Sequence, residues 1–135
     1  MKRTLITLAV AGCCAFAGTA GAALSKDEYK AQKDRVEADY KAAKERCGAL
    51  KDNAQDICKV EAKGNHNVAK AELEAQREPS PRHDEKLRLA KADAAYDLAK
   101  EKCDDLSGNA KDTCKKDAKA AFVSAKADAK VAVKK

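Results

Sequence analysis

The feature that most constrains this chain is a pair of cysteines with ten residues between them, which occurs twice. Cys47 and Cys58 form the first pair, and Cys103 and Cys114 form the second. Eleven residues of uninterrupted helix rise about 16 Å, whereas a disulfide requires Cα atoms within about 7 Å of each other. A bond within one pair therefore requires the chain to reverse its direction between the two cysteines.

A shift of 56 residues superposes the two cysteine pairs and much of the sequence around them. Between residues 40–72 and 96–128, 16 of 33 positions are identical, and the matches include a tyrosine, a leucine, an asparagine and both cysteines. Two alanine- and lysine-rich stretches can share Ala and Lys by chance, but not these rarer residues in register. The chain is therefore an internal duplication. Its two prolines, Pro79 and Pro81, separate the copies, because proline interrupts a continuous helix.

The apolar residues of each copy recur with the period of an α-helix. In the first copy Val36, Tyr40, Ala43, Cys47 and Leu50 follow one another at steps of three or four residues. The positions between them are mostly Lys, Glu, Asp and Arg, which are good or neutral helix formers. We predict four helices, over residues 25–50, 54–77, 83–106 and 110–133.

The segment between the two cysteines of each copy carries helix-capping residues. In the second copy, Gly108 suits a helix end, Asn109 an N-cap, and Asp112 the acid of a capping box. The first copy keeps Asn53 and Asp56 at the equivalent positions. Each copy is then predicted to be a helical hairpin. The predicted fold class is all-α, with two tandem disulfide-stapled hairpins, four helices and alanine-rich, coiled-coil-like packing after an N-terminal signal peptide.

Two disulfide connectivities are compatible with the sequence. The local bonds Cys47–Cys58 and Cys103–Cys114 form if each copy turns at its asparagine. If each copy were one long helix and the chain reversed at the prolines, Cys47 would meet Cys114 and Cys58 would meet Cys103. That second arrangement resembles the twin-cysteine helical hairpins, whose usual spacing is one residue shorter. We favour the local bonds, and both connectivities stay open at this point.

The N-terminus has the pattern of a secretory signal peptide. Lys2 and Arg3 precede an uncharged run over residues 4–24, which contains a small-x-small motif at residues 20–22. We predict cleavage after Ala22 and a location in the periplasm or outside the cell. The remaining 113 residues carry 26 basic and 22 acidic side chains, a net charge of +4. The predicted division is a signal peptide over 1–22, one hairpin repeat over 23–78 and a second, with a basic C-terminal end, over 79–135.

Residues 10–13 also resemble the lipobox of bacterial lipoproteins, in which Cys13 would be lipidated. That alternative leaves Cys14 as an unpaired thiol, whereas cleavage after Ala22 leaves an even set of four cysteines. An even set of cysteines in an exported chain favours disulfides over a metal site.

The predicted hydrophobic core is thin. Leu, Ile, Val and Phe together account for 15 of the 113 residues that follow the predicted cleavage site. So few bulky residues cannot fill a large core, and a chain of this composition approaches the range of disordered sequences. We therefore expect a narrow, helix-rich structure that depends on its disulfides.

The sequence carries no recognisable catalytic or cofactor motif. It has no C-x-x-C, no glycine-rich phosphate loop and no G-x-S-x-G, and its carboxylates are dispersed among lysines. The two histidines, His66 and His83, are isolated and are expected to be exposed and solvated. We predict no enzymatic activity, no cofactor and no metal site.

The C-terminal segment, residues 119–135, is locally basic, with five lysines and one aspartate. Cations suit the negative end of a helix, but such a segment can also attract anionic polymers or lipid head groups. The export signal and the 22 acidic residues disfavour nucleic acid as the partner.

Residues 44–58 and 100–115 resemble small exported, alanine- and lysine-rich proteins of Gram-negative bacteria, among them TolA-like cell-envelope proteins. The resemblance implies a helical protein of the cell envelope. It rests on helical composition, so the bridging role of TolA is not carried over. The leading expectation is a non-enzymatic periplasmic protein with a structural, envelope-associated or client-binding role. The alternative is a secreted basic binder of lipopolysaccharide, lipid head groups or nucleic acid.

Overall fold

The computed structural model describes residues 23–131, which form four α-helices. The predicted signal peptide and the lipobox cysteine lie outside the described residues. The helices are α1 (Lys26–Gly48), α2 (Asp52–Arg77), α3 (Pro81–Cys103) and α4 (Gly108–Val131). The all-α prediction is confirmed, and each predicted helix is present. Up to Val131, where the described residues end, the observed bounds differ from the predicted ones by at most three residues.

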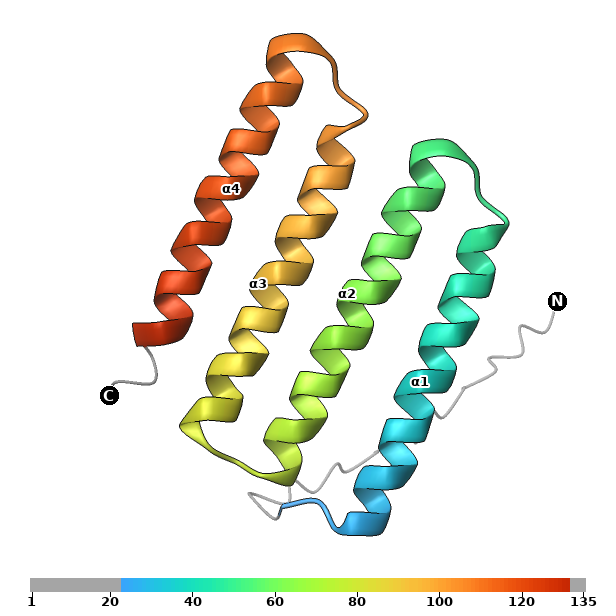
Figure 1. Ribbon diagram of the computed structural model, residues 1–135, viewed down its shortest axis with the longest axis vertical. Helices are drawn as coiled ribbons and strands as arrows, with labels where there is room; N and C mark the ends of the chain where they lie inside the picture. Colours follow the sequence, from blue (N-terminus) through green and yellow to red (C-terminus); the bar gives the residue numbers. More distant parts are fainter. Residues whose placement is uncertain (1–22, 132–135) are drawn as a thin grey trace, which may run out of the picture.

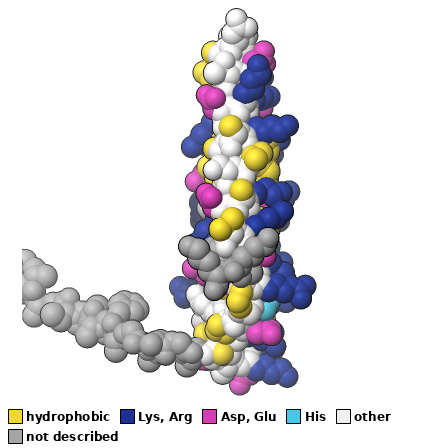
Figure 2. Space-filling view, turned by 90° about the vertical axis from the view of Figure 1, so that its left-hand side faces the viewer, with side chains coloured by type: hydrophobic (Ala, Val, Ile, Leu, Met, Phe, Trp, Pro, Cys, Tyr) yellow, Lys and Arg dark blue, Asp and Glu magenta, His cyan; other side chains and the backbone are white. Residues whose placement is uncertain are grey.

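The four helices lie side by side in a single antiparallel layer (Figure 1). Each helix packs only against the helices next to it in the sequence, so α1 and α4 form opposite edges of the layer. Figure 2 looks onto the edge formed by α4 and shows how thin the layer is. Within the described residues, no helix therefore covers either face of the layer.

Serine side chains begin the first helix of each copy. The Ser25 hydroxyl accepts a hydrogen bond from the Glu28 backbone N–H, and the Glu28 carboxylate accepts one from the Ser25 backbone N–H, which completes a capping box. Ser80 caps α3 by accepting from the His83 N–H at 3.2 Å. Pro81 follows as the first helical residue, a position at which the missing N–H costs no hydrogen bond.

The predicted caps inside the hairpins are wrong. The N-cap of α2 is Lys51, without a side-chain hydrogen bond, and Asn53 lies inside the first helical turn. Gly108 begins α4 instead of ending α3, so Asn109 also lies inside the first turn of its helix. Sequence alone could not show that each helix begins early, which moves the two asparagines one or more positions past the cap.

With the asparagines displaced, the two acids fall inside the helices as well. Asp56 and Asp112 are exposed residues of α2 and α4, not partners in a capping box. The tight turn instead uses the residue before each asparagine. Gly108 has a φ of 54° and the equivalent Asp52 a φ of 52°. This left-handed conformation is easy for glycine and tolerated by aspartate.

The disulfides are local. Cys47 bonds to Cys58 with a Cα–Cα distance of 5.5 Å, and Cys103 bonds to Cys114 at 5.7 Å. The favoured connectivity is confirmed, and the alternative that joins the two copies is wrong because the chain reverses between each pair. Cys47 and Cys103 are the most deeply buried side chains of the described residues. Each disulfide therefore takes the place of an apolar core beside the turn of its hairpin.

The remaining core is small, as predicted. The buried residues besides the two cysteines are Ala62, Leu73, Ala92, Ala129 and Gly64. Gly64 lets α2 approach α3 closely, because a Cβ atom at this position would lie 2.9 Å from the Cβ of Ala94. Small residues thus set the spacing of the layer, and little apolar area is removed from water.

The first prediction concerns the disulfides. Replacing both Cys47 and Cys58 by alanine should lower the free energy of unfolding by about 2–4 kcal/mol. The reason is that the unfolded chain gains conformational entropy when the disulfide no longer closes a loop in it. Replacing Cys103 and Cys114 serves as the matched variant in the other copy and should cost a similar amount. Urea unfolding followed by circular dichroism measures both. Unchanged midpoints would contradict a stapling role.

The second prediction concerns Asn53, which links the two hairpins. Its Nδ2 donates to the Glu101 carbonyl oxygen at 3.2 Å and to Asp105 Oδ1 at 2.6 Å. Asn53→Ala should destabilise by about 1 kcal/mol, since it removes hydrogen bonds that include one to a charged group. Asn109→Ala is the matched control, because Asn109 occupies the equivalent, exposed position on the free edge of α4. Equal losses for the two variants, in urea unfolding, would contradict this role.

Candidate anion-binding face

One face of the layer carries two equivalent pairs of stacked rings. Tyr40 of α1 stacks on His66 of α2 with ring centroids 4.3 Å apart, and Tyr96 of α3 stacks on Phe122 of α4 at 4.5 Å. The 56-residue shift relates Tyr40 to Tyr96 and His66 to Phe122. The two hairpins therefore present the same construction on the same face.

Lysine side chains lie over these rings. The Nζ of Lys44 is 4.5 Å from the Tyr40 centroid, and that of Lys100 is 5.4 Å from the Tyr96 centroid. Lys126 lies over Phe122 at 5.0 Å. Cation–π contacts of this length hold the ammonium groups on the ring faces. The aromatic pairs thus fix the positions of cations on this side of the layer.

Further lysines follow the same side at helical spacing. On α2, Lys59, Lys63 and Lys70 flank His66 at steps of three and four residues, and the same steps recur around Phe122 on α4. We call the surface defined by these side chains the lysine face. Its basic residues are Lys26, Lys30, Lys33 and Lys44 on α1, Lys59, Lys63 and Lys70 on α2, Lys86 and Lys100 on α3, and Lys115, Lys119, Lys126 and Lys130 on α4.

Basic side chains accordingly project mainly from one side of the layer when it is seen along its edge (Figure 2). Acidic residues interrupt the lysine face between α2 and α3, where Asp93 and Asp97 lie beside Lys63. Glu74 also pairs with Lys86 at 3.8 Å. Lys115 pairs with Asp104 at 2.7 Å. Within the described residues the other lysines of the face make no ion pair within 4 Å, so their charge is available to a partner.

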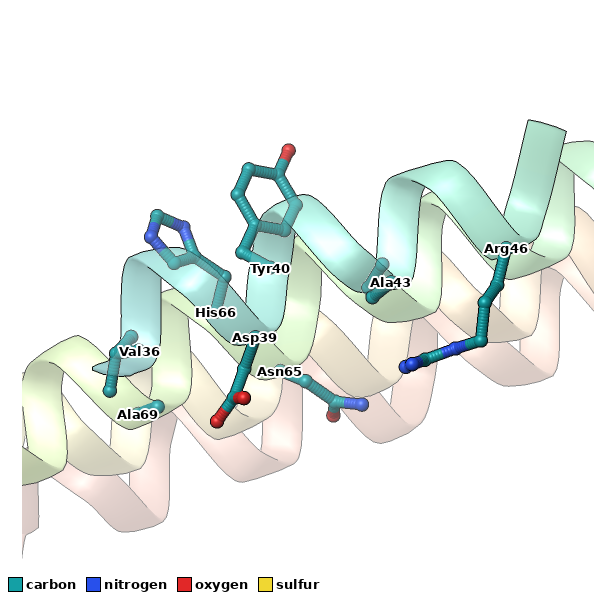
Figure 3. A pocket seen from close by; sticks show the side chains of 9 residues that line it. Val36, Asp39, Tyr40, Ala43, Arg46, Asn65, His66 and Ala69 are labelled. Carbon is teal, nitrogen blue, oxygen red and sulfur yellow. The ribbon is translucent and has the colours of Figure 1, made fainter. Parts of the chain in front are cut away.

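The groove between α1 and α2 shows how the two faces differ (Figure 3). Tyr40 and His66 point to one side of the helix pair, whereas Asp39, Asn65 and Arg46 point to the other. Small apolar residues lie between the two groups. The groove is shallow and open, so it lacks the enclosure that a small-molecule site requires.

His66 is not the exposed, solvated residue that we predicted. Its side chain is only 11% exposed, and its Nε2 lies 3.1 Å from Glu37 Oε1. This is a close approach and not a well-aligned hydrogen bond. The His66 side chain, with smaller contributions from Lys70 and Lys33, holds the pKa of Glu37 below its ordinary value. The stacking on Tyr40 explains the burial, and nothing in the sequence around His66 indicated it.

His83 has a structural position at the turn between the two copies. Its Nδ1 lies 2.6 Å from the Glu78 carbonyl oxygen and 3.1 Å from the Ser80 hydroxyl. The ring is half-buried, so the prediction of a solvated side chain is wrong here too. His83 therefore helps to close the turn that precedes α3.

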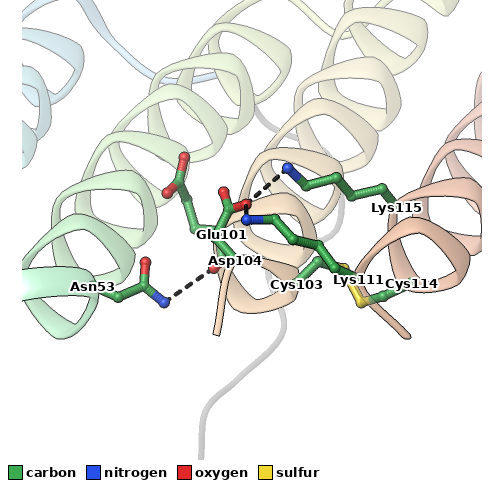
Figure 4. The surroundings of a disulfide bond; sticks show 7 residues. All are labelled: Asn53, Glu101, Cys103, Asp104, Lys111, Cys114 and Lys115. Atoms are coloured by element: carbon green, nitrogen blue, oxygen red, sulfur yellow. Dashed lines mark hydrogen bonds and ion pairs between the residues drawn. A yellow bond between two sulfur atoms is a disulfide. The ribbon is translucent and has the colours of Figure 1, made fainter. Parts of the chain in front are cut away.

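A cluster of charges surrounds the second disulfide (Figure 4). Lys111 and Lys115 of α4 donate to Asp104 at the end of α3, at 2.8 and 2.7 Å. Their hydrogen bonds lower the pKa of Asp104 to about 2. The cluster holds α3 and α4 together beside the Cys103–Cys114 bond.

The third prediction follows from Asp104. Because its pKa is lower in the folded than in the unfolded chain, its contribution to stability is present above about pH 4 and is lost as the pH falls toward 2. Asp104→Asn should therefore destabilise the protein at neutral pH and flatten the loss of stability between pH 4 and 2. Melting temperatures measured by circular dichroism across this range test it. Asp93→Asn, on the exposed surface of α3, is the control, and a parallel acid response in Asp104→Asn and the unmodified protein would contradict the prediction.

The structure brings together the four predicted cysteines but not the predicted caps. Sequence reasoning missed the lysine face, although a signal for it was present. The 56-residue shift aligns Lys44 with Lys100, and also Lys59, Lys63 and Lys70 with Lys115, Lys119 and Lys126. Lysines that recur in register at helical spacing indicate a charged stripe. Only the arrangement of the helices shows that the stripes share one face.

No family model, curated protein or solved structure matches this chain. Over residues 23–131, no helix is long and apolar enough to cross a membrane. The same residues contain no group of three or more His, Cys, Asp or Glu side chains placed to hold a metal ion. The chemistry that the described surface offers most clearly is the binding of anions.

Proposed function

We propose that this protein is a non-enzymatic helical protein of the periplasm that associates with the cell envelope by binding phosphate-bearing lipid head groups through its lysine face. The observation that carries the proposal is the gathering of lysines on one side of a flat layer. The lysine face has at least three lysines on each of α1, α2 and α4 and two on α3. An extended anionic surface can meet all of them at once, which a compact ligand cannot.

The flatness of the layer supports a surface as the partner. Helices of 23–26 residues span roughly 35–40 Å, and the lysines are distributed over most of that length. Each lysine held near an anionic membrane surface contributes about 1 kcal/mol. Several such contacts made together give useful affinity without an enclosed pocket.

Periplasmic location is supported by two features. The N-terminal 22 residues have the pattern of a signal peptide, and the described part of the chain contains two disulfides. Disulfides persist in oxidising compartments such as the periplasm.

The fourth prediction tests the lysine face with lipid vesicles. The protein should bind phosphatidylcholine vesicles that contain phosphatidylglycerol, and it should bind pure phosphatidylcholine much more weakly. Lys63→Glu/Lys119→Glu changes equivalent positions of the two copies and should weaken binding to the anionic vesicles at least about tenfold, because each reversal removes an attraction and adds a repulsion. Vesicle co-sedimentation measures the affinity, which should also fall as salt is added.

The control changes the charge by the same amount elsewhere. Lys51→Glu/Lys116→Glu alters an exposed turn residue and an exposed residue on the outer edge of α4. It should weaken binding much less than the lysine-face variant. Equal losses would contradict a role for this face. Tighter binding to duplex DNA than to the anionic vesicles, at equal phosphate concentration, would contradict lipid head groups as the ligand.

A further inference from the structure

The face opposite the lysine face carries charge of both signs in a regular order. On the first helix of each copy, two basic residues are eleven positions apart, and on the second helix two acidic residues are eleven apart. Eleven residues complete about three helical turns, so each pair points to the same side. We call this surface the alternating face. It is made by Arg35 and Arg46 on α1, Glu61 and Glu72 on α2, Lys91 and Lys102 on α3, and Asp117 and Asp128 on α4.

Three shallow grooves place these residues on one side of the layer. Arg46 and Asn65 line the groove between α1 and α2, pointing away from Tyr40 and His66 (Figure 3). Asn65 also lines the next groove, between α2 and α3, together with Glu61 and Lys91. Asp117 lines the groove between α3 and α4. Asp39 also points to this side, between Arg35 and Arg46, and reduces the charge of these three α1 residues to a net +1. The eight residues of the alternating face therefore form four columns, in the order positive, negative, positive, negative.

The floors of these grooves are apolar and open. Val68, Ala95 and Leu98 lie in the central groove, and Ala99, Ala118 and Ala121 lie in the groove beside α4. All eight charged residues of the alternating face are exposed, and within the described residues none of them makes an ion pair within 4 Å. The face thus offers both apolar area and unpaired charges to a partner.

We propose that a second copy of this chain stacks on the alternating face and forms a two-fold symmetric dimer of two helical layers. The two-fold axis runs parallel to the helices, between α2 and α3. This symmetry places α1 over α4 of the other copy and α2 over α3 of the other copy. Every positive column then lies over a negative one, and the apolar central grooves of the two copies meet on the axis.

The register of α1 and α4 fits this arrangement. The bond between Cys47 and Cys58 sets the height of α1 against α2, and the contact between Gly64 and Ala94 sets α2 against α3. The bond between Cys103 and Cys114 then sets α3 against α4. Counting along the antiparallel helices through these three contacts brings position 47 level with position 117. In the dimer Arg46 therefore lies about one residue from the height of Asp117 of the other copy, and Arg35 lies equally close to the height of Asp128. The same count leaves Glu61 and Glu72 about five residues from the heights of Lys102 and Lys91 of the other copy, so the close charge pairs are those between α1 and α4.

Other ways of pairing two copies are less favourable. A two-fold axis across the helices would place α1 over α1 and so set arginine against arginine. Two lysine faces would repel each other. Two copies are also poor partners edge to edge, because the outer helices carry charged residues at the contact positions. α4 has Lys116 where α2 has Val60, and α1 has Asp34 where α3 has Ala90. Terminal units of repeat proteins carry such polar edges.

The available area is sufficient for a stable dimer. Four helices about 35 Å long, spaced 8–10 Å apart, offer on the order of 1,000 Å² per copy, and a standard interface uses about 800 Å² per partner. The stack also gives the protein the two packed layers around a shared core that domains ordinarily have. It leaves both lysine faces on the outside, so the inference does not rest on the proposed function.

The fifth prediction is that the oxidised protein is a dimer in solution. Sedimentation equilibrium should give twice the mass of the chain in the micromolar range. Arg35→Glu/Arg46→Glu should raise the dissociation constant at least about tenfold, since it sets like charges against each other. Adding Asp117→Arg/Asp128→Arg to this variant should restore the dimer. Because α1 and α4 do not touch within one chain, such a rescue can arise only between chains.

The control and the contrary outcomes are distinct from those of the vesicle experiment. Lys63→Glu/Lys119→Glu lies on the opposite face and should leave the mass unchanged. Helicity measured by circular dichroism confirms that each variant is folded. A monomer throughout the micromolar range, an assembly that keeps growing with concentration, or a dimer that the charge swap does not restore would each overturn the proposal.

Discussion

The structure depends on one covalent constraint, the disulfide that joins the two helices of each hairpin beside its turn. A chain with so few bulky apolar residues removes little area from water when it folds, so packing alone stabilises each hairpin weakly. The bonds Cys47–Cys58 and Cys103–Cys114 offset this by limiting the unfolded state. They also fix the height of one helix against the next. The positions of the aromatic pairs and of the charged columns follow from that register.

Holding helices by disulfides and small residues has a consequence for shape. A bundle closes when bulky side chains on several helices meet at a common centre, and this chain has no such centre in its described part. Gly64 and Ala94 instead bring α2 and α3 together along a narrow strip. The result is a layer with two large faces (Figure 1). The charges divide between the faces, with lysines and aromatic rings on one and alternating charges over apolar grooves on the other.

Much of this fold could be predicted from particular residues. The period of Tyr40, Cys47 and their equivalents predicts the helices, and the spacing of the cysteines predicts a reversal inside each copy. The exact helix starts could not be predicted, because Asn53 and Asn109 are good N-caps in isolation. In the first copy, Asn53 instead donates to the Glu101 carbonyl oxygen and to Asp105 of the second hairpin. His66 could not be placed either, since its burial requires the ring of Tyr40 from another helix.

The sequence by itself determined that the chain is helical, duplicated and equipped with paired cysteines, because helical periodicity and repeat register are local properties of the residue order. It also contains, at fixed intervals, the lysines of the lysine face and the charged pairs of the alternating face. Only the tertiary structure decided which cysteines bond to each other and that the four helices form one open layer. It also decided that stripes from separate helices share a face. These outcomes depend on contacts between residues far apart in the chain, and such contacts are set by the turn geometry and the spacing of packed helices.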